Sequence, residues 1–234
     1  MEPKVNASER KTDCGKITYS RLGIVADSHG ELDKIIAALN FLSENGCDGI
    51  FHLGDICDSA HPETAEACVR PLIDSAVMAI KGNNDHQIDV SHRGQAGGPG
   101  DRDDLIPRDV LEFIRKLPLV RSCQNAIFTH SLPFARKLGL SSMIGVMGEM
   151  ELNRFFSADP QGILFRGHSH DPEIACKQDH QIIYRALQPG RQYKITDRLP
   201  CVVTCGALTS SFCIIWMPGE GTIECHQFNV SEFL

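Results

Sequence analysis

The sequence predicts an α/β fold in which two stacked mixed β-sheets are flanked by helices, a four-layer α/β/β/α sandwich. Two observations predict it. The first half of the 234-residue chain alternates short apolar runs with helical patterns, which is typical of a parallel sheet with crossover helices. The second half is mostly a series of short segments in which apolar and polar residues alternate between turn residues, which is typical of antiparallel strands. Stacking two such sheets with helices outside would bury both sets of apolar positions.

The first half is expected to begin with three strands separated by two helices. In chain order, we expect strand, helix, strand, helix and strand over residues 21–26, 31–44, 49–53, 62–70 and 75–80. The first helix carries apolar residues at helical spacing, and Gly46 follows its end. Ligand sites of parallel α/β sheets lie beyond the carboxyl ends of the strands, so polar residues that follow these strands are site candidates.

Residues 87–108 interrupt this alternation. Glycines, Pro99 and three aspartates predict a flexible polar insertion within a single domain that spans residues 17–234. Such an insertion is either a lid over the site or a solvated loop. A helix over residues 109–116, capped by Asp109, is expected to follow it.

The second half is expected to hold one helix, over residues 148–156, among short strands. The strands are expected over residues 119–121, 126–129, 162–165, 173–176, 181–186, 201–204, 212–217 and 222–228. The pattern does not predict a conformation for residues 131–147.

Composition limits the function. A net charge of −7 leaves no general basic surface, so we expect no strong nucleic-acid binding. No apolar run approaches the roughly 20 residues of a membrane span. Residues 1–16 are polar and lack the apolar core of a secretion signal, so we expect a disordered tail on a cytoplasmic protein with no membrane partner. A homo-oligomer is possible.

The ten cysteines show no paired spacing, and we expect reduced thiols that pack as small hydrophobic residues. A zinc site built from cysteines 201, 205, 213 and 225 is a weaker alternative, because no C-x2-C pair is present.

Five short clusters of oxygen and imidazole side chains follow the apolar runs. They are Asp27-Ser28-His29, Gly54-Asp55, Gly82-Asn83-Asn84-Asp85, His130 and Gly167-His168-Ser169-His170. This mixture suits divalent metals such as Mn, Fe and Zn. The candidate metal ligands are Asp27, His29, Asp55, Asn83, His130, His168 and His170. They are too many for one tetrahedral ion and about right for two ions that share a carboxylate, which predicts a binuclear hydrolase.

The same clusters resemble those of the calcineurin-like metallophosphoesterase superfamily. Its pattern is D-x-H, G-D-x-x-[DE], G-N-x-[DE], a lone H and G-H-x-H, and this chain matches it in order within residues 21–170. Protein phosphatases of the superfamily have His where this chain has Asn84. The chain is more similar to the small bacterial and archaeal phosphodiesterases, in which this position is commonly not His.

The resemblance implies a ligand set and a reaction. One metal would take Asp27, His29 and His170. The second would take Asn83, His130 and His168, and Asp55 would bridge the two. Mn is the metal most expected, with Fe, Zn, Ni and Co as alternatives. The implied reaction is hydrolysis of a small phosphodiester or phosphomonoester by a hydroxide that bridges the two ions.

Further residues are assigned to catalysis with alternatives left open. Asp55 and Asn84 are candidates, and without a histidine at 84 we expect leaving groups of low pKa, such as aryl esters. His52 either acts on the substrate side or is a buried, hydrogen-bonded histidine. Asp85 either orients a metal ligand or caps a helix. The rival function is a non-catalytic interaction scaffold with the same fold, which the complete ligand set disfavours.

Overall fold

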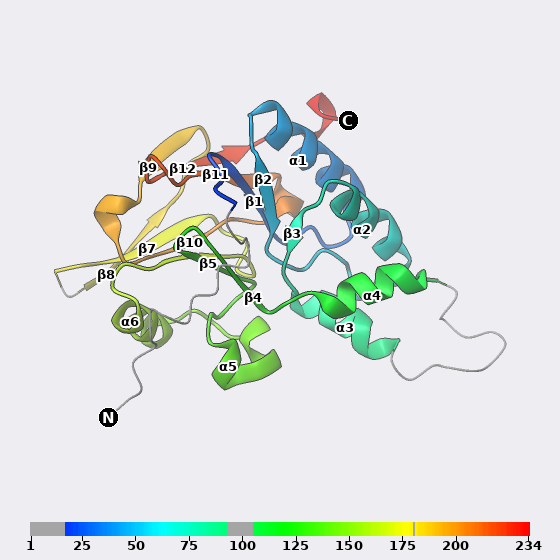
Figure 1. The fold of residues 1–234 in the computed structure, drawn as a ribbon, viewed down its shortest axis with the longest axis horizontal. Coiled ribbons are helices and arrows are strands. Elements are labelled where there is room, and N and C mark those ends of the chain that lie inside the picture. Colours follow the sequence, from blue (N-terminus) through cyan, green and yellow to red (C-terminus); the bar gives the residue numbers. More distant parts are fainter. Residues whose placement is uncertain (1–16, 93–104, 180) are drawn as a thin grey trace.

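The computed structural model of the protein describes residues 17–92, 105–179 and 181–234. Two six-stranded mixed sheets pack face to face, and helices lie on their outer sides (Figure 1). The expected tail, residues 1–16, lies outside the described residues, as do residues 93–104 of the expected insertion. Among the described residues, no helix is both long and apolar enough to cross a membrane.

The first sheet has the strand order β3-β2-β1-β11-β12-β9. Its strands are β1 (Leu22–Val25), β2 (Gly49–His52), β3 (Met78–Ala79), β9 (Arg191–Lys194), β11 (Phe212–Met217) and β12 (Thr222–Gln227). β1, β2 and β3 are parallel, as the alternation with helices predicts, while β11 pairs antiparallel with β1 and opposes Trp216 to Leu22. β9, an exposed edge strand, was not expected.

The second sheet has the strand order β4-β5-β6-β10-β7-β8. Its strands are β4 (Val120–Cys123), β5 (Ala126–Thr129), β6 (Ile163–Arg166), β7 (Glu173–Gln178), β8 (Gln181–Ala186) and β10 (Cys201–Thr204). β6 pairs in parallel with both β5 and β10, while β10 pairs antiparallel with β7, so the sheet is mixed, as predicted. The antiparallel run expected from residue 173 onward did not include the parallel pairing of β10 with β6. The chain reaches β6 from β5 through helices, and it reaches β10 from the other sheet. Neither return path is visible in the alternation of apolar and polar residues.

Among the described residues, six α-helices flank the sheets. They are α1 (Leu32–Glu44), α2 (Ala65–Asp74), α3 (Asn83–Ser91), α4 (Arg108–Lys116), α5 (Ala135–Leu138) and α6 (Glu149–Ala158). Helix α3 was not expected, and it occupies residues 87–91 of the expected insertion. Asp109 does not cap α4, because Pro107 holds the N-cap position; instead Asp109 accepts hydrogen bonds from Arg70 of α2.

Apolar side chains fill three layers. The central layer lies between the sheets and includes Phe51 and Phe128, whose stacked rings have centroids 3.9 Å apart. A second layer lies between the first sheet and the helices α1, α2 and α4. A third lies between the second sheet and α6, where Phe155 packs near Leu164. Three apolar layers separate four layers of secondary structure, which confirms the predicted sandwich.

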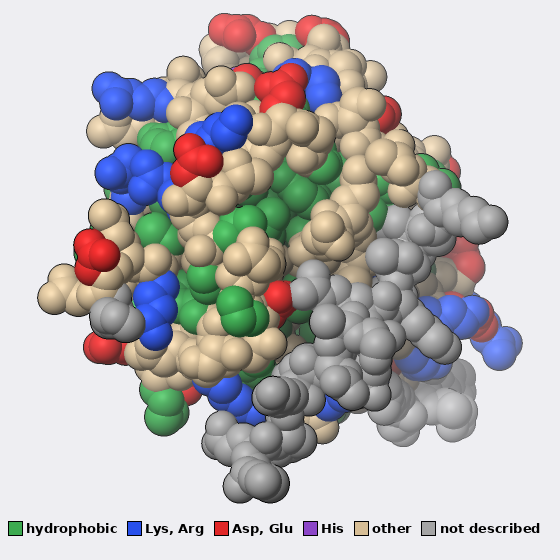
Figure 2. Space-filling view, turned by 60° about the vertical axis from the view of Figure 1, so that its left-hand side comes forward, with side chains coloured by type: hydrophobic (Ala, Val, Ile, Leu, Met, Phe, Trp, Pro, Cys, Tyr) green, Lys and Arg blue, Asp and Glu red, His purple; other side chains and the backbone are tan. Residues whose placement is uncertain are grey.

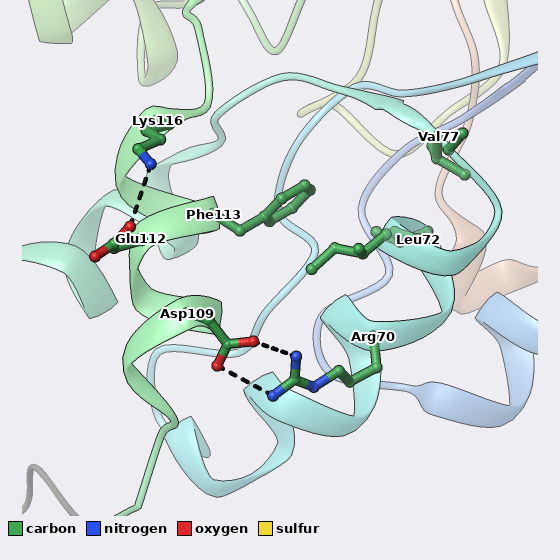
Figure 3. A pocket seen from close by; sticks show the side chains of 9 residues that line it. Arg70, Leu72, Val77, Asp109, Glu112, Phe113 and Lys116 are labelled. Carbon is green, nitrogen blue, oxygen red and sulfur yellow. Dashed lines mark hydrogen bonds and ion pairs between the residues drawn. The ribbon is translucent and has the colours of Figure 1, made fainter.

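Two features of the surface are apolar: one face of the molecule and one pocket. On the face seen in Figure 2, hydrophobic side chains show in the centre and most charged ones lie around them. A pocket of about 530 Å³ lies between α2 and α4, with Leu72, Val77 and Phe113 in its lining (Figure 3). None of the candidate metal ligands lines this pocket.

Eight of the described cysteines are free thiols, but Cys123 is disulfide-bonded, so the expectation of reduced thiols is wrong for that residue. The alternative zinc site gains no support, because the groups of described residues that could hold a metal contain no cysteine.

Candidate metal centre

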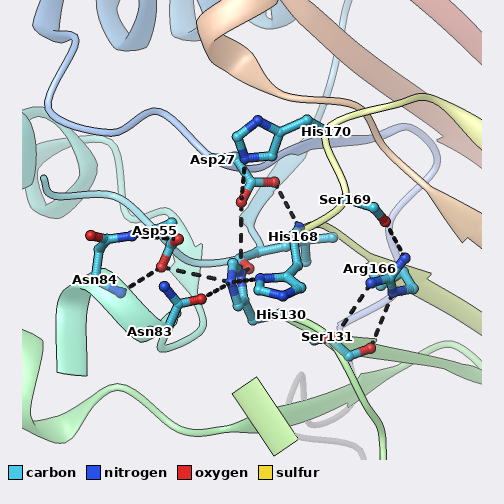
Figure 4. Close-up of polar contacts among 12 residues, drawn as sticks. Asp27, Asp55, Asn83, Asn84, His130, Ser131, Arg166, His168, Ser169 and His170 are labelled. Atoms are coloured by element: carbon cyan, nitrogen blue, oxygen red, sulfur yellow. Dashed lines mark hydrogen bonds and ion pairs between the residues drawn. The ribbon is translucent and has the colours of Figure 1, made fainter. Parts of the chain in front are cut away.

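The five sequence clusters meet at the carboxyl ends of strands β1, β2, β3, β5 and β6. Each cluster begins within four residues of its strand, and the turns that carry them lie side by side across the two sheets (Figure 4). Two groups of side chains have donor atoms within 4.8 Å of one another: Asp27 with His29 and His170, and Asp27 with Asp55 and His130. The fold therefore gathers the residues that the sequence singled out, and it places Asp27 as well as Asp55 between the two groups.

The first group is compact. His29 Nε2 lies 3.3 Å from His170 Nε2, and His170 Nε2 lies 3.7 Å from Asp27 Oδ1. Asp55 Oδ2 lies 3.9 Å from His29 Nε2. Burial lowers the pKa of His170, which favours the neutral imidazole that a metal requires.

The second group is centred on His130, which is fully buried. Its Nδ1 lies 2.8 Å from the carbonyl oxygen of Leu53, which can only accept, so Nδ1 carries the proton and Nε2 presents a lone pair. That Nε2 lies 3.0 Å from Asn83 Oδ1, 3.2 Å from His168 Nδ1 and 3.6 Å from Asp55 Oδ1. Burial lowers the pKa of His130 to about 4 and keeps the ring neutral.

These donors fit a cation. Asp27 is fully buried, and its Oδ1 has no hydrogen-bond partner, while its Oδ2 accepts from the backbone N–H of His168 at 2.9 Å. Burial, and then the charge of Asp55, raise the pKa of Asp27 well above its ordinary value. Acceptor atoms that face one another without a shared proton repel, and an unpartnered buried carboxylate oxygen is costly. A divalent ion supplies the missing positive charge, so the residues present fit the metals that the sequence predicts.

The backbone is strained at the same positions. Five of the seven candidate ligands have left-handed φ angles, a region that non-glycine residues occupy at a cost of about 1–3 kcal/mol each. They are Asp27 (57°), His29 (44°), Asp55 (53°), His168 (69°) and His170 (64°). Backbone hydrogen bonds hold these turns, from the N–H of Asp27 to Gly54 O and from that of His29 to Asp55 O, both at 3.0 Å. Strain of this kind concentrates at functional sites.

Two glycines allow the turns after β2 and β3 to touch. A Cβ on Gly82 would lie 2.1 Å from the backbone nitrogen of Asp55, and one on Gly54 would lie 2.6 Å from the nitrogen of Gly82. Gly54 also has a φ of 90°. The glycine in each motif therefore brings Asp55 next to the start of α3, where Asn83 lies.

Asn84 holds Asp55 on both carboxylate oxygens. Its backbone N–H donates to Oδ1 at 2.8 Å and its Nδ2 donates to Oδ2 at 2.8 Å. Its Oδ1 accepts from the hydroxyl of Ser59 at 2.7 Å. Both polar atoms of the Asn84 side chain are therefore hydrogen-bonded within the protein.

Asp85 and His52 are buried and form hydrogen bonds to the turns that carry the candidate ligands. Asp85 Oδ2 accepts from Gly82 N at 2.9 Å, and its Oδ1 accepts from the N–H groups of Ile56 and Cys57. It therefore caps α3, one of its two expected roles. His52 is fully buried with Nε2 3.0 Å from Ser28 Oγ, and burial lowers its pKa to about 3. This is the buried, hydrogen-bonded alternative of the sequence analysis.

Sequence reasoning missed Arg166, the last residue of β6. It is buried beside the site and donates to Ser131 and Ser169, the neighbours of candidate ligands (Figure 4). The available signal was a charged residue that ends an apolar strand directly before the G-H-x-H motif.

Two stacked mixed sheets with oxygen and imidazole donors at their carboxyl ends are the architecture of a metal-dependent phosphoesterase, and comparisons with known proteins agree. The calcineurin-like phosphoesterase superfamily domain matches residues 21–208. The chain therefore belongs to the calcineurin-like phosphoesterase superfamily, and this membership supports a hydrolase that acts on phosphate esters.

Individual relatives are distant. An uncharacterised protein of Methanocaldococcus jannaschii is 23% identical over 209 residues, which cover 83% of this chain and 82% of the relative. The crystal structure of a metallophosphoesterase from Sphaerobacter thermophilus superposes with a TM-score of 0.69 at 18% identity, covering 92% of this chain and 91% of that one. A hypothetical protein from Pyrococcus horikoshii superposes with a TM-score of 0.60 at 12% identity, covering 92% of each chain. At these identities the two structures show the fold alone.

Proposed function

We propose that this protein is a binuclear metal-dependent phosphoesterase that hydrolyses a small phosphodiester or phosphomonoester. The observation that carries the proposal is that Asp27 is shared by two groups of candidate ligands, one with His29 and His170 and one with Asp55 and His130, while its buried Oδ1 has no hydrogen-bond partner. Asp27, His29 and His170 would hold one ion, and Asn83, His130 and His168 the other. Asp55, which faces both groups, would bridge them. Mn is the metal we expect, with Fe, Zn, Ni and Co as alternatives.

Two such ions, when bound, supply Lewis acidity toward the phosphoryl oxygens and lower the pKa of a water that serves as the nucleophile. The chain's own residues provide orientation. Leu53 O fixes the tautomer of His130, and the N–H of His168 orients Asp27. Asn84 orients Asp55.

The arrangement favours esters with good leaving groups. Asn84 occupies the position at which protein phosphatases of the superfamily have a histidine, and its side chain is turned toward Asp55 and Ser59. It cannot donate a proton to a leaving oxygen, since an amide is not an acid at neutral pH. His52 is buried against Ser28. We therefore assign both residues to positioning the turns that carry the ligands, and we expect aryl esters to be cleaved faster than alkyl esters.

The test is turnover of bis-p-nitrophenyl phosphate and p-nitrophenyl phosphate by metal-free protein supplied with Mn, Ni, Co or Zn. We expect activity with at least Mn, loss of it in EDTA, and about two ions per chain by elemental analysis. A matched control is His61→Ala, because the His61 side chain is exposed and pairs with Glu63, not with a candidate ligand. Two bound ions without turnover of any ester would favour the scaffold function, and fewer than one ion per chain would contradict the metal centre.

Replacing Asn84 by Ala should weaken metal binding. The change removes the side-chain bonds to Asp55 Oδ2 and to Ser59 and leaves the backbone bond to Asp55 Oδ1. Loss of a residue that orients a ligand typically costs about 10–100-fold in metal affinity or activity. Calorimetric titration with Mn measures the change, and Ser59→Ala, which removes only the outer bond of Asn84, should lose less. Equal losses in the two variants would show that the bond to Asp55 contributes nothing.

A further inference from the structure

Arg166 lies in the interior beside the candidate metal centre and is 5% exposed. Its guanidinium donates four hydrogen bonds, each to a neutral oxygen. Nε donates to Ser131 O at 3.2 Å and Nη2 to Ser131 Oγ at 3.3 Å. Nη1 donates to Ser169 Oγ at 2.5 Å and to Thr204 Oγ1 at 3.2 Å (Figure 4). A single planar group therefore joins the ends of three strands, β5, β6 and β10.

Burying a guanidinium is costly unless its charge is compensated. Burial lowers the pKa of Arg166 to about 10, so it keeps its charge at neutral pH. The charge of Asp27 is the largest influence in the opposite direction, and Arg166 in turn lowers the pKa of Asp27. The cation is therefore placed where it favours the ionised form of a candidate ligand.

Two of the three tethered positions are neighbours of candidate ligands. Ser131 follows His130 directly, and Ser169 lies between His168 and His170. The facing nitrogens of His130 and His168 are 3.2 Å apart, so a small rotation of either turn would change the distance between two donors. The two-pronged bond to Ser131 and the short bond to Ser169 fix these turns relative to each other.

The same network continues away from the ligands. Ser131 Oγ, which accepts from Arg166, donates to the carbonyl oxygen of Gly145, and Leu132 N donates to Ser142 O at 2.9 Å. Residues 142–145 belong to the connection between β5 and α6 that the sequence left without a predicted conformation. Arg166 thereby also ties this connection to the turn that carries His130.

We propose that Arg166 is a positioning residue of the metal centre, which holds the turns of His130 and of His168 and His170 in one fixed arrangement through the planar fork of its guanidinium. The proposal rests on the proposed function, because it assigns those histidines to metal ions. Lysine could reach only part of the set, since a single ammonium group cannot match the spacing of the three acceptor residues.

If Arg166 only stabilised the fold, its partners would behave differently on substitution than if it positions metal ligands. A substitution at Thr204 distinguishes the two roles. Thr204 accepts from the same guanidinium and is as buried as Arg166, but it ends β10 and has no candidate ligand beside it. If Arg166 only ties strands together, Thr204→Val and Ser169→Ala should have similar effects. If it positions ligands, only Ser169→Ala should disturb the metals.

The experiment compares Arg166→Lys, Ser169→Ala and Thr204→Val in the full-length chain. Three quantities are measured: the midpoint of thermal unfolding in EDTA, Mn affinity and stoichiometry by calorimetry, and the electron paramagnetic resonance spectrum of the Mn-loaded protein. We expect Arg166→Lys and Ser169→Ala to lose about 10–100-fold in Mn affinity. We also expect an altered spectrum of the Mn pair in these variants. Thr204→Val should retain the wild-type spectrum and affinity within about threefold, since it removes no bond to a ligand turn.

Wild-type affinity and spectrum in Arg166→Lys and Ser169→Ala would overturn the role of Arg166, provided that the wild type binds two Mn ions, and would leave the proposed function intact. Equal losses in Ser169→Ala and Thr204→Val would overturn it as well. A wild type that binds fewer than one Mn ion would overturn the metal centre and this role together. If Arg166→Lys does not fold, the comparison of Ser169→Ala with Thr204→Val decides alone.

Discussion

Replacing Asp55 by Asn should lower kcat/KM by about a thousandfold or more and weaken the binding of both metal ions. Metal coordination contributes several kcal/mol to the stabilisation of a phosphoryl transition state, and each 1.36 kcal/mol is a factor of about ten in rate. The two oxygens of Asp55 face the two groups, Oδ2 toward His29 and Oδ1 toward His130. A neutral amide removes charge from both sides at once. The amide introduced by Asp55→Asn also places an NH2 group where one oxygen of Asp55 accepted from Asn84. One of the two hydrogen bonds from Asn84 is therefore lost.

The comparison that tests this expectation is with variants that remove one terminal ligand. His29→Ala and Asn83→Ala should each weaken mainly one ion and cost less activity than Asp55→Asn. Asp48→Asn is the matched control, because Asp48 is an exposed carboxylate that accepts two backbone hydrogen bonds at the amino ends of β1 and β2, opposite to the ends that carry the motifs. Two Mn ions per chain and a normal rate in Asp55→Asn would show that this residue does not bridge.

Most strands could be predicted from the sequence because each is a short apolar run between turn residues. Helix α3 could not, because residues 83–91 contain only two aliphatic side chains, Ile88 and Val90, and so show no helical period. Ion pairs with residues outside the helix hold it in place. Lys81 and Arg115 both contact the buried carboxylate of Asp89, at 3.5 Å and 2.9 Å. Such pairing joins α3 to α4 and cannot be read from local pattern.

The candidate ligands could be predicted because each follows the carboxyl end of a short apolar strand, and each of these strands has at least one parallel neighbour. Their supports could not be predicted in the same way. The sequence named Asn84 as a catalytic candidate and gave no indication of its partners, which are Asp55 and Ser59 on the preceding turn. The acceptors of Arg166 lie 35 and 38 residues away for Ser131 and Thr204. Contacts of that separation depend on which strands become neighbours, and the parallel pairing of β6 with β5 and β10 was the part of the topology that the sequence did not predict.

Replacing Asp27 by Asn should stabilise the metal-free protein at neutral pH while destroying its stabilisation by metal. In the fold, burial and the charge of Asp55 raise the pKa of Asp27 well above the value near 3.9 of an unfolded aspartate. The folded state therefore holds the proton more tightly than the unfolded state. The stability this gives is present at pH values below the unfolded pKa and is lost as the pH rises through the raised pKa. Asparagine is neutral at every pH, so the variant does not lose this stability as the pH rises.

Urea unfolding in EDTA between pH 4 and pH 8 measures the effect as the difference in free energy of unfolding between variant and wild type. We expect this difference to grow with pH in favour of the variant, because only the wild type loses stability as the pH rises through the raised pKa of Asp27. Adding Mn should reverse the order, because an ion that binds only the folded wild type stabilises it by mass action. A variant that is less stable than wild type in EDTA at pH 8 would contradict the inference. Such a result would mean that the unpartnered oxygen of Asp27 does not destabilise the metal-free fold.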